Sequence, residues 1–558
     1  MLPLLTPGYV LSYDMVFVPR YRLSADLLGI SQQVPRAVPT EGAVAVLSRV
    51  VPGDVLEKAI LIGVFVLAAA GAARLVPATR PVARLAAGVL YAWNPIVYER
   101  LLIGHWFLLV GYAALPWVAA AALDLRRGRA GAVPRLGLWL ALTGLAGPYS
   151  GILGAGVAVL FAAAPPWPGE RAASVRRAVW ALGLGILVNL PWLVPSLLRP
   201  GGLPSTGAGL QAFAARSDSP LGTLGSLLSL GGLWNTDLAP PGRSSGFWIP
   251  GFACMLAVAG LGWWGLRRRW PRFAVVALLG GAAIGLGLAA DGAVPGLGAA
   301  YRWIAVHVPG GGLFRDSQKF VAPLALALAV GFGMGVEQVL AAFASAPRPA
   351  LASRAGAVVL VLLPLSLVPT LAWGAGNRLA SVEYPRSWPE ARSVMAADPV
   401  PGSVLVLPWH LYLPLRWNDG HIALDPAQRF FTRPALTTER LELRSGTLPS
   451  EDPLARRADR VVAGGRPLAP ALPSLGARYV LVLKEADWRQ FEARLGGLQR
   501  VLDSPELMLF RSPAAPRAVS VARPAAAPVV IADVAVLAAL LAMLAALALG
   551  FRRAAGPA

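Results

Sequence analysis

The stretch PGFACMLAVAGLGWWGLRRRWPRFAVVALLGGAAIGLGLAA (residues 250–290) consists of two apolar runs separated by a short cluster of arginines. Each run, 250–267 and 273–290, approaches the roughly 20 residues that an α-helix needs to cross a bilayer. The arginines lie in the turn RRRWPR (267–272), and short arginine-rich loops stay on the cytoplasmic side of a membrane. The stretch therefore predicts a pair of membrane helices joined by a cytoplasmic turn.

Apolar runs of this kind recur through the whole chain. The 558 residues are 56% hydrophobic and 14% charged, whereas a soluble domain carries about 25% charged residues. The mean hydropathy is +0.59. We predict an α-helical polytopic membrane protein with about 11 transmembrane helices. The predicted spans are 58–76, 83–97, 106–124, 136–147, 150–166, 178–197, 250–267, 273–290, 319–342, 355–374 and 528–551.

The loops between these spans predict the orientation of the chain. Every second loop is rich in arginine, which indicates that these loops are cytoplasmic. The net charge of +21 is therefore attributed to contact with the bilayer and not to nucleic-acid binding. We expect a multi-pass protein of the cytoplasmic membrane whose large loops and soluble domain face outside. The predicted external segments are 1–57, 94–106, 147–150, 198–249, 291–318 and 375–527.

The chain is predicted to fall into four parts. Residues 1–57 form an external first loop, 58–374 a multi-span domain, 375–527 an external α/β domain, and 528–558 a C-terminal transmembrane helix with a short cytoplasmic tail. The α/β prediction rests on the strand-like runs SVLVLPW (403–409), ARYVLVL (477–483) and ELMLFR (506–511), and on a helical pattern at 484–497. The opening MLPLLTPGY has too few apolar residues for a signal peptide or helix, so we expect a first helix upstream of it.

Ionisable side chains collect in the external loops and are scarce inside the spans. Transporters usually need such groups at mid-bilayer depth, so this distribution favours an enzyme that acts on a lipid-linked substrate at the membrane surface. The candidate site residues are Asp14, Glu99, Arg100, His105, Trp234, Asn235, Asp237, Arg315 and Lys319. Arg315 and Lys319 are four residues apart, on one face of an expected helix start, and external cations there suit a phosphate.

Each of these residues also has a simpler structural explanation. The simpler explanation makes Asp14 a solvated loop acid, although its apolar neighbours Tyr13 and Met15 to Phe17 argue for a partner. It makes Glu99 and Arg100 an ion pair at a helix end. Arg315 and Lys319 fit lipid-headgroup anchors, and Trp234 fits an interfacial belt aromatic. The single cysteine and four scattered histidines give no metal-ligand spacing, so no metal site is predicted, although assistance by a divalent metal is left open.

Three short motifs carry a resemblance to a known class of enzymes. The segments SYDMVFVP (12–19), WNPIVYERLLIGHW (93–106) and FRDSQKF (314–320), together with the loop architecture, resemble the GT-C class of integral membrane glycosyltransferases. Within that class they look similar to an actinobacterial group near the arabinofuranosyltransferases of cell-wall arabinan. The resemblance implies a polyprenyl-phosphate sugar donor and places the first-loop catalytic acid on Asp14. No second acid adjoins Asp14, so a metal-binding pair is not implied.

These observations lead to one leading hypothesis and one alternative. The leading hypothesis is transfer of a sugar from a polyprenyl phosphate to an extracytoplasmic cell-envelope glycan. In it Asp14 is the general base, Arg315 and Lys319 bind the phosphate, and the α/β domain recognises the acceptor. Glu99 and Asp237 are reserve candidates for the base or for contacts with sugar hydroxyls. The alternative is a non-catalytic lipid-linked-glycan transporter or envelope-assembly scaffold, in which Asp14 and Arg315 need not lie near each other.

Overall fold

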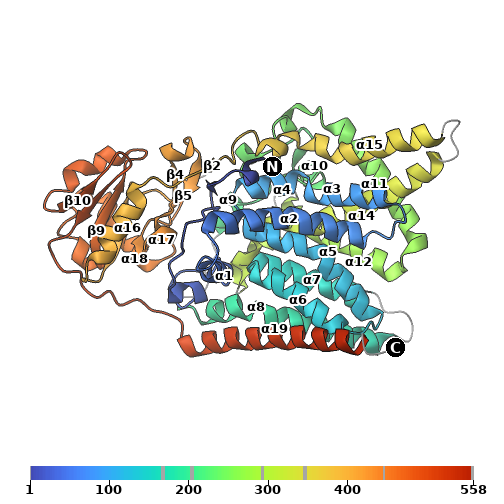
Figure 1. The fold of residues 1–558 in the computed structure, drawn as a ribbon, viewed down its shortest axis with the longest axis horizontal. Coiled ribbons are helices and arrows are strands. Elements are labelled where there is room, and N and C mark those ends of the chain that lie inside the picture. The colour runs from blue at the N-terminus through green and yellow to red at the C-terminus, as the bar shows by residue number, and fades with distance from the viewer. Residues whose placement is uncertain are drawn as a thin grey trace.

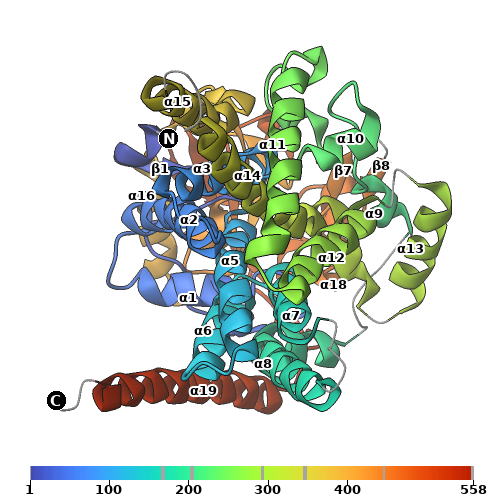
Figure 2. The ribbon, with the colours of Figure 1, turned by 90° about the vertical axis from the view of Figure 1, so that its right-hand side faces the viewer.

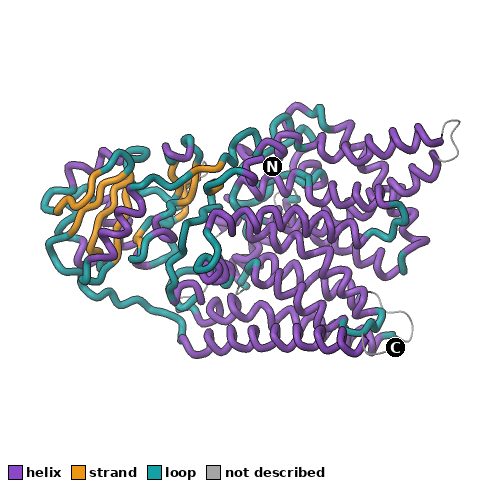
Figure 3. Tube along the Cα trace, viewed as in Figure 1, coloured by secondary structure: helices purple, strands orange, loops and turns teal. Residues whose placement is uncertain are grey.

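The computed structural model describes residues 2–164, 170–200, 207–290, 294–308, 310–343, 349–443 and 446–554. A long helical bundle occupies most of the molecule, and the strands gather at one end of it (Figures 1 and 3). The N-terminal segment runs between these two parts. This arrangement confirms the predicted fold class, a mostly helical membrane protein with a small mixed α/β region.

Eight of the described helices are long and apolar enough to cross a membrane. They are α2 (Gly53–Leu75), α5 (Trp106–Arg126), α8 (Arg171–Leu198), α11 (Ile249–Arg269), α12 (Arg272–Ala289), α14 (Ala322–Phe343), α15 (Pro349–Leu367) and α19 (Ala526–Ala554). Two shorter apolar helices, α6 (Ala132–Leu145) and α7 (Pro148–Ala163), are separated at Gly147, where the sequence also predicted the break.

The predicted span 83–97 differs from the structure. It is occupied by α3 (Pro81–Ala92) and the start of α4 (Pro95–Leu102). The break comes at Asn94, whose side chain accepts a hydrogen bond from the Val97 N–H and caps α4, and Pro95 follows it. With 12 residues, α3 is roughly 18 Å long, shorter than a hydrocarbon core of about 30 Å, and α4 continues the chain toward the start of α5.

Helix α14 is the central element of the bundle, since nearly all of its side chains are buried. It packs against α11, α3 and α12. A Cβ on Gly335 would lie 1.8 Å from the Val258 carbonyl oxygen, so only glycine permits the close approach of α14 to α11. At the periphery, α19 lies along α6 and α8 (Figure 2).

The α/β region is built on a five-stranded sheet in the order β10-β11-β9-β3-β6. Strands β3 (Ser403–Leu407), β6 (Ala435–Leu436) and β9 (Ala477–Leu483) are parallel, while β11 (Leu507–Arg511) and β10 (Gln499–Asp503) are antiparallel to their neighbours. All three predicted strands are present. The predicted helix at 484–497 is instead a short 3-10 helix, Trp488–Arg494. Helices α16 (Ser387–Ala397), α17 (Ala427–Phe430) and α18 (Pro453–Ala463) and the hairpins β4 (Tyr412–Pro414)–β5 (Ile422–Leu424) and β7 (Leu441–Leu443)–β8 (Gly446–Leu448) complete the region.

The N-terminal segment joins the bundle to the α/β region. Strand β1 (Tyr9–Val10) pairs antiparallel with β2 (Ser381–Val382). Tyr13 then exchanges backbone hydrogen bonds with the β5 edge, donating to the Ile422 carbonyl at 2.9 Å and accepting from the Leu424 N–H at 2.8 Å. The remaining described α-helices are α1 (Thr40–Leu47), α9 (Gly207–Ala212), α10 (Gly222–Leu228) and α13 (Pro295–His307). Asp14 is therefore held at the junction of the two parts.

Candidate functional site

The turn that carries Asp14 packs directly on the loop between α4 and α5. The Met15 N–H donates to the Ser12 carbonyl at 2.9 Å, and the Asp14 N–H donates to the Ile103 carbonyl at 3.2 Å. Gly104 has a φ of +82°, and a Cβ there would lie 2.1 Å from the Met15 nitrogen. Only glycine fits both the backbone conformation and the space. Gly104 thus sets the distance between the Asp14 turn and the next residue, His105.

The Asp14 carboxylate accepts two hydrogen bonds from neutral donors. Its Oδ1 accepts from the Tyr412 hydroxyl at 2.6 Å, and its Oδ2 lies 3.2 Å from His105 Nε2. The Arg100 guanidinium lies 3.0 Å from His105 Nδ1, and a guanidinium can only donate, so Nδ1 accepts. The proton of a neutral His105 is therefore on Nε2 and is donated to Asp14. About 30% of the Asp14 side chain remains exposed.

These contacts determine the charges of the pair. Burial raises the pKa of Asp14, but the hydrogen bonds from His105 and Tyr412 outweigh it, so the pKa lies below its usual value. Burial lowers the pKa of His105, and the nearby charges of Lys319 and Arg100 act in the same direction. At neutral pH the arrangement is an ionised carboxylate beside a neutral imidazole.

Arg100 connects the Asp14 pair to the FRDSQKF motif. Its fully buried guanidinium donates to both oxygens of Asp316, at 2.6 and 2.7 Å, and its Nε donates to Gln318 Oε1 at 2.9 Å. Lys319 Nζ lies 2.9 Å from Asp316 Oδ2. Burial raises the pKa of Asp316, but the charges of Arg100 and Lys319 outweigh it and hold that pKa well below its usual value. The expected Glu99–Arg100 ion pair is absent among the described residues, because Arg100 pairs with Asp316.

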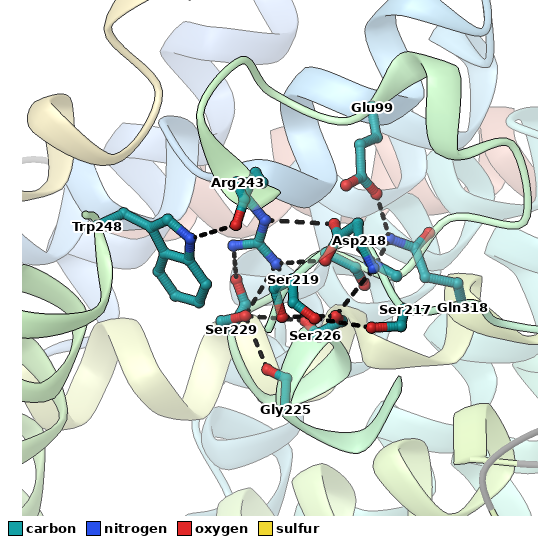
Figure 4. Close-up of polar contacts among 12 residues, drawn as sticks. Glu99, Ser217, Asp218, Ser219, Gly225, Ser226, Ser229, Arg243, Trp248 and Gln318 are labelled. Atoms are coloured by element: carbon teal, nitrogen blue, oxygen red, sulfur yellow. Dashed lines mark hydrogen bonds and ion pairs between the residues drawn. The ribbon is translucent and has the colours of Figure 1, made fainter. Parts of the chain in front are cut away.

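Glu99 contacts the side-chain nitrogen of Gln318 (Figure 4), whereas Arg100 contacts the side-chain oxygen of the same residue. Its Oε2 accepts from Gln318 Nε2 at 2.8 Å, while its buried Oε1 has no hydrogen-bond partner among the described residues. Burial and the neighbouring Asp218 carboxylate raise the pKa of Glu99 well above its usual value, against the charge of Arg243. The surroundings of Glu99 therefore favour its protonated form over the carboxylate.

A second buried ion pair holds the loop beside Glu99. Arg243 donates to Asp218 through Nη2 at 2.9 Å and Nε at 3.2 Å, and its guanidinium lies over the Trp248 ring, 4.3 Å from the centroid (Figure 4). The Gly231 carbonyl of this loop accepts from Gln318 Nε2 at 3.2 Å. Gln318 thus fixes the loop, Glu99 and Arg100 relative to one another.

Arg315 and Lys319 point to different neighbours, which differs from the expectation that they share one helix face. Asp316 between them has a φ of +62°, and the helical turn begins only after it. Lys319 turns inward to Asp316 and lies 3.7 Å from the Tyr149 ring centroid. Arg315 lies over the Phe213 ring, 4.6 Å from its centroid, and is 28% exposed.

Arg36 and Glu451 join Arg315 at the surface of the site. Arg36 pairs with Glu451 at 2.5 Å, and Arg315 approaches the same carboxylate at 3.9 Å. Burial lowers the pKa of Arg315, and the positive charge of Arg36 lowers it further, although both guanidinium groups stay charged at neutral pH. We call Arg36, Arg315 and Lys319 the basic cluster. Arg36 and Arg315 share the single carboxylate of Glu451, so these three side chains together keep a net positive charge.

The predicted residues Trp234, Asn235 and Asp237 lie further from Asp14. Trp234 packs edge-to-face on Phe213, with ring centroids 4.8 Å apart, so it reaches Arg315 only through that ring. The Asn235 side chain accepts from the Asp237 N–H at 3.3 Å and caps a short 3-10 helix. Asp237 itself is exposed. Their roles in substrate binding stay predictions.

Several residues of the site were missed at the level of sequence. Asp316 and Gln318 stand inside the quoted FRDSQKF motif, so the motif itself was the available signal. Tyr412 and Arg36 had no such signal, because their neighbours come from segments hundreds of residues away. Among the described residues, no three His, Cys, Asp or Glu side chains are grouped closely enough to hold a metal ion.

Comparison with solved structures gives the fold class independently. Two cryo-EM structures of arabinofuranosyltransferase AftD from mycobacteria match over 92% of this chain, with TM-scores of 0.62 and 0.55 and sequence identities of 19% and 17%. The fold is GT-C-like. This chain spans only 41% and 40% of the length of those AftD chains.

Other comparisons add little to this result. The archaeal oligosaccharyltransferase AglB from Archaeoglobus fulgidus, in complex with an inhibitory peptide and a dolichol-phosphate, matches over 86% of this chain and 64% of its own at 12% identity. Its TM-score of 0.39 is too low to establish a shared fold. No family model and no curated protein matches the sequence.

Proposed function

We propose that this protein is a membrane glycosyltransferase that moves a sugar from a polyprenyl-phosphate donor to a glycan acceptor outside the cytoplasmic membrane. The observation that carries the proposal is the state of Asp14. It is an ionised, partly exposed carboxylate whose close side-chain partners among the described residues are the neutral donors Tyr412 and His105. A general base must be ionised and within reach of the acceptor hydroxyl, and this carboxylate meets both requirements.

In the proposed reaction, Asp14 accepts the proton of an acceptor hydroxyl as that oxygen attacks the anomeric carbon of the donor sugar. The bond between the anomeric carbon and the phosphate oxygen breaks on the opposite face, and polyprenyl phosphate leaves with the electron pair. The configuration at the anomeric carbon is inverted. A positioned base contributes roughly 10²–10⁴-fold to such a step.

The basic cluster is the proposed partner of the departing phosphate. Arg315 and Arg36 are partly exposed, and negative charge grows on the leaving phosphate during the reaction. His105 and Arg100 connect Asp14 to Asp316, which is the residue after Arg315 in the chain. The alternative of a non-catalytic scaffold or transporter does not require Asp14 and Arg315 to be connected in this way. Tyr412 comes from the α/β region, which supports a role for that region in presenting the acceptor to Asp14.

The test is an Asp14→Asn variant assayed in membranes with polyprenyl-phosphate sugars, beginning with arabinofuranose, the sugar in the name of AftD. Asparagine keeps the size of the side chain but cannot take a proton, so turnover should fall by at least about 100-fold. Asp26→Asn is the matched control, since Asp26 lies in the same N-terminal segment and pairs at the surface with Arg22. Full turnover by Asp14→Asn, with the wild type active, would refute Asp14 as the base.

A further inference from the structure

A cavity of about 480 Å³ lies at the ends of helices α2 and α5 and beside the start of α3. Its volume is within the range of roughly 300–1,000 Å³ that is usual for small-molecule sites. It is far larger than the cavity of about 10 Å³ beside Arg100 and Lys319. Helix α5 starts at Trp106, next to His105, and ends at Arg126 after 21 residues, so the cavity is roughly 30 Å from the Asp14 site.

The walls of this cavity combine positive charge with an apolar base. Arginine is the main polar residue in the lining, and Asp124 is its one acid. The lining consists of Ala73, Arg74, Leu75, Arg84, Ala120, Leu123, Asp124, Arg127, Arg129 and Trp270. Leu75, Leu123 and Trp270 are buried, so they form the floor. A ligand that fits must be anionic at one end and tolerate hydrocarbon at the other.

Two of the arginines are available for a ligand. Arg129 is paired with Asp124 at 2.8 Å, and Arg84 donates through Nε to the Ala78 carbonyl at 2.8 Å, so both already have a partner. The side chains of Arg74 and Arg127 make no hydrogen bond or ion pair with any described residue. Both are exposed.

We propose that this cavity binds the phosphate headgroup of an anionic phospholipid, with Arg74 and Arg127 as its principal ligands. Guanidinium groups match the oxygens of a phosphodiester in geometry and charge. Basic pockets between the ends of membrane helices are recurrent headgroup sites. The ends of α2 and α5 that line the cavity lie at the end of the bundle opposite the α/β region (Figure 1). Arginine-rich helix ends of this kind are expected at the level of the lipid headgroups. This site is separate from the proposed transfer reaction, and its occupancy does not require sugar transfer.

The binding test uses the purified full chain in a neutral detergent. Its melting temperature is followed as dioctanoyl phosphatidylglycerol is added, with dioctanoyl phosphatidylcholine as the zwitterionic comparison. Phosphatidylglycerol should stabilise the wild type at a concentration at least about fivefold lower than phosphatidylcholine. The double variant Arg74→Gln/Arg127→Gln should lose this preference. Equal half-saturating concentrations for the two lipids would overturn the proposal.

Two controls separate a defined site from diffuse positive charge. Arg171→Gln/Arg176→Gln removes the same number of exposed arginines from the start of α8, outside the cavity, and should keep the preference. An equal loss in that variant would show that only overall charge matters. If inorganic phosphate at the same concentration stabilises the protein equally, the ligand is a soluble phosphate and the lipid assignment fails. Arg127→Gln alone provides the same test if the double variant does not fold.

Discussion

Replacement of Gly104 by alanine is expected to impair the site without unfolding the protein. The new Cβ would lie 2.1 Å from the Met15 nitrogen, 2.4 Å from the Ser12 oxygen and 2.6 Å from the Asp14 nitrogen. Ordinary contacts of a Cβ begin at 3.4 Å. The Asp14 turn and the His105 loop must therefore separate by about 1 Å, which is the scale of misplacement that can cost an enzyme about 100-fold in rate.

The stability cost of this substitution can be estimated separately. An alanine at a φ of +82° costs about 1–2 kcal/mol, and forcing apart two packed backbones adds about 1–3 kcal/mol. Gly465→Ala is the matched control, because Gly465 has a φ of +68° and nothing within 4 Å of the added Cβ. It carries the conformational cost alone.

The assay compares turnover with a polyprenyl-phosphate sugar, together with thermal melting, in the wild type and both variants. Gly104→Ala should lose about 100-fold in turnover, whereas Gly465→Ala should stay within about twofold of the wild type. Both variants should melt as folded proteins at lower temperature. If Gly104→Ala and Gly465→Ala have the same turnover, the close packing of the two backbones does not position Asp14.

Three further predictions concern the charges of the site. The thermal stability of the wild type should fall as pH rises above about 4.3, because the unfolded chain releases the Glu99 proton there while the folded protein holds it. Glu99→Gln should remove this fall, and an unchanged pH dependence would contradict the reasoning. Tyr412→Phe should raise the pKa of Asp14 and move the acidic limb of the kcat/KM profile to higher pH, and an unmoved limb would exclude the hydrogen bond as a cause. Asp316→Asn leaves the buried Arg100 without its carboxylate and should cost about 3–5 kcal/mol of stability; a melting temperature equal to that of the wild type would show that the pair is not structural.

Much of the fold could be predicted from local sequence. Apolar runs of nearly 20 residues with arginines at their ends predicted the long helices, and short apolar runs predicted β3, β9 and β11. The prediction was wrong for 83–97, where Asn94 and Pro95 end one helix and start another. The prediction of a helix at 484–497 was also wrong in its type and length. The structure has a 3-10 helix at Trp488–Arg494, and Phe491 in it packs against the sheet.

The candidate site was predictable only as a set of motifs. The sequence placed Asp14, His105, Arg100 and Arg315 in loops expected on one face of the membrane. It could not assign their partners, because a carboxylate has no local preference for one cation over another.

The sequence by itself determined that this chain inserts in a membrane as helices, since the hydrophobic effect acts on each apolar run independently of the rest. Only the tertiary structure decided which charges meet. It paired Arg100 with Asp316 instead of its neighbour Glu99, raised the pKa of the buried Glu99, and brought Tyr412 to Asp14 across 398 positions. Electrostatic and hydrogen-bond energies fall steeply with distance, so the chemistry of Asp14 depends on contacts that exist only once the bundle and the α/β region have packed together.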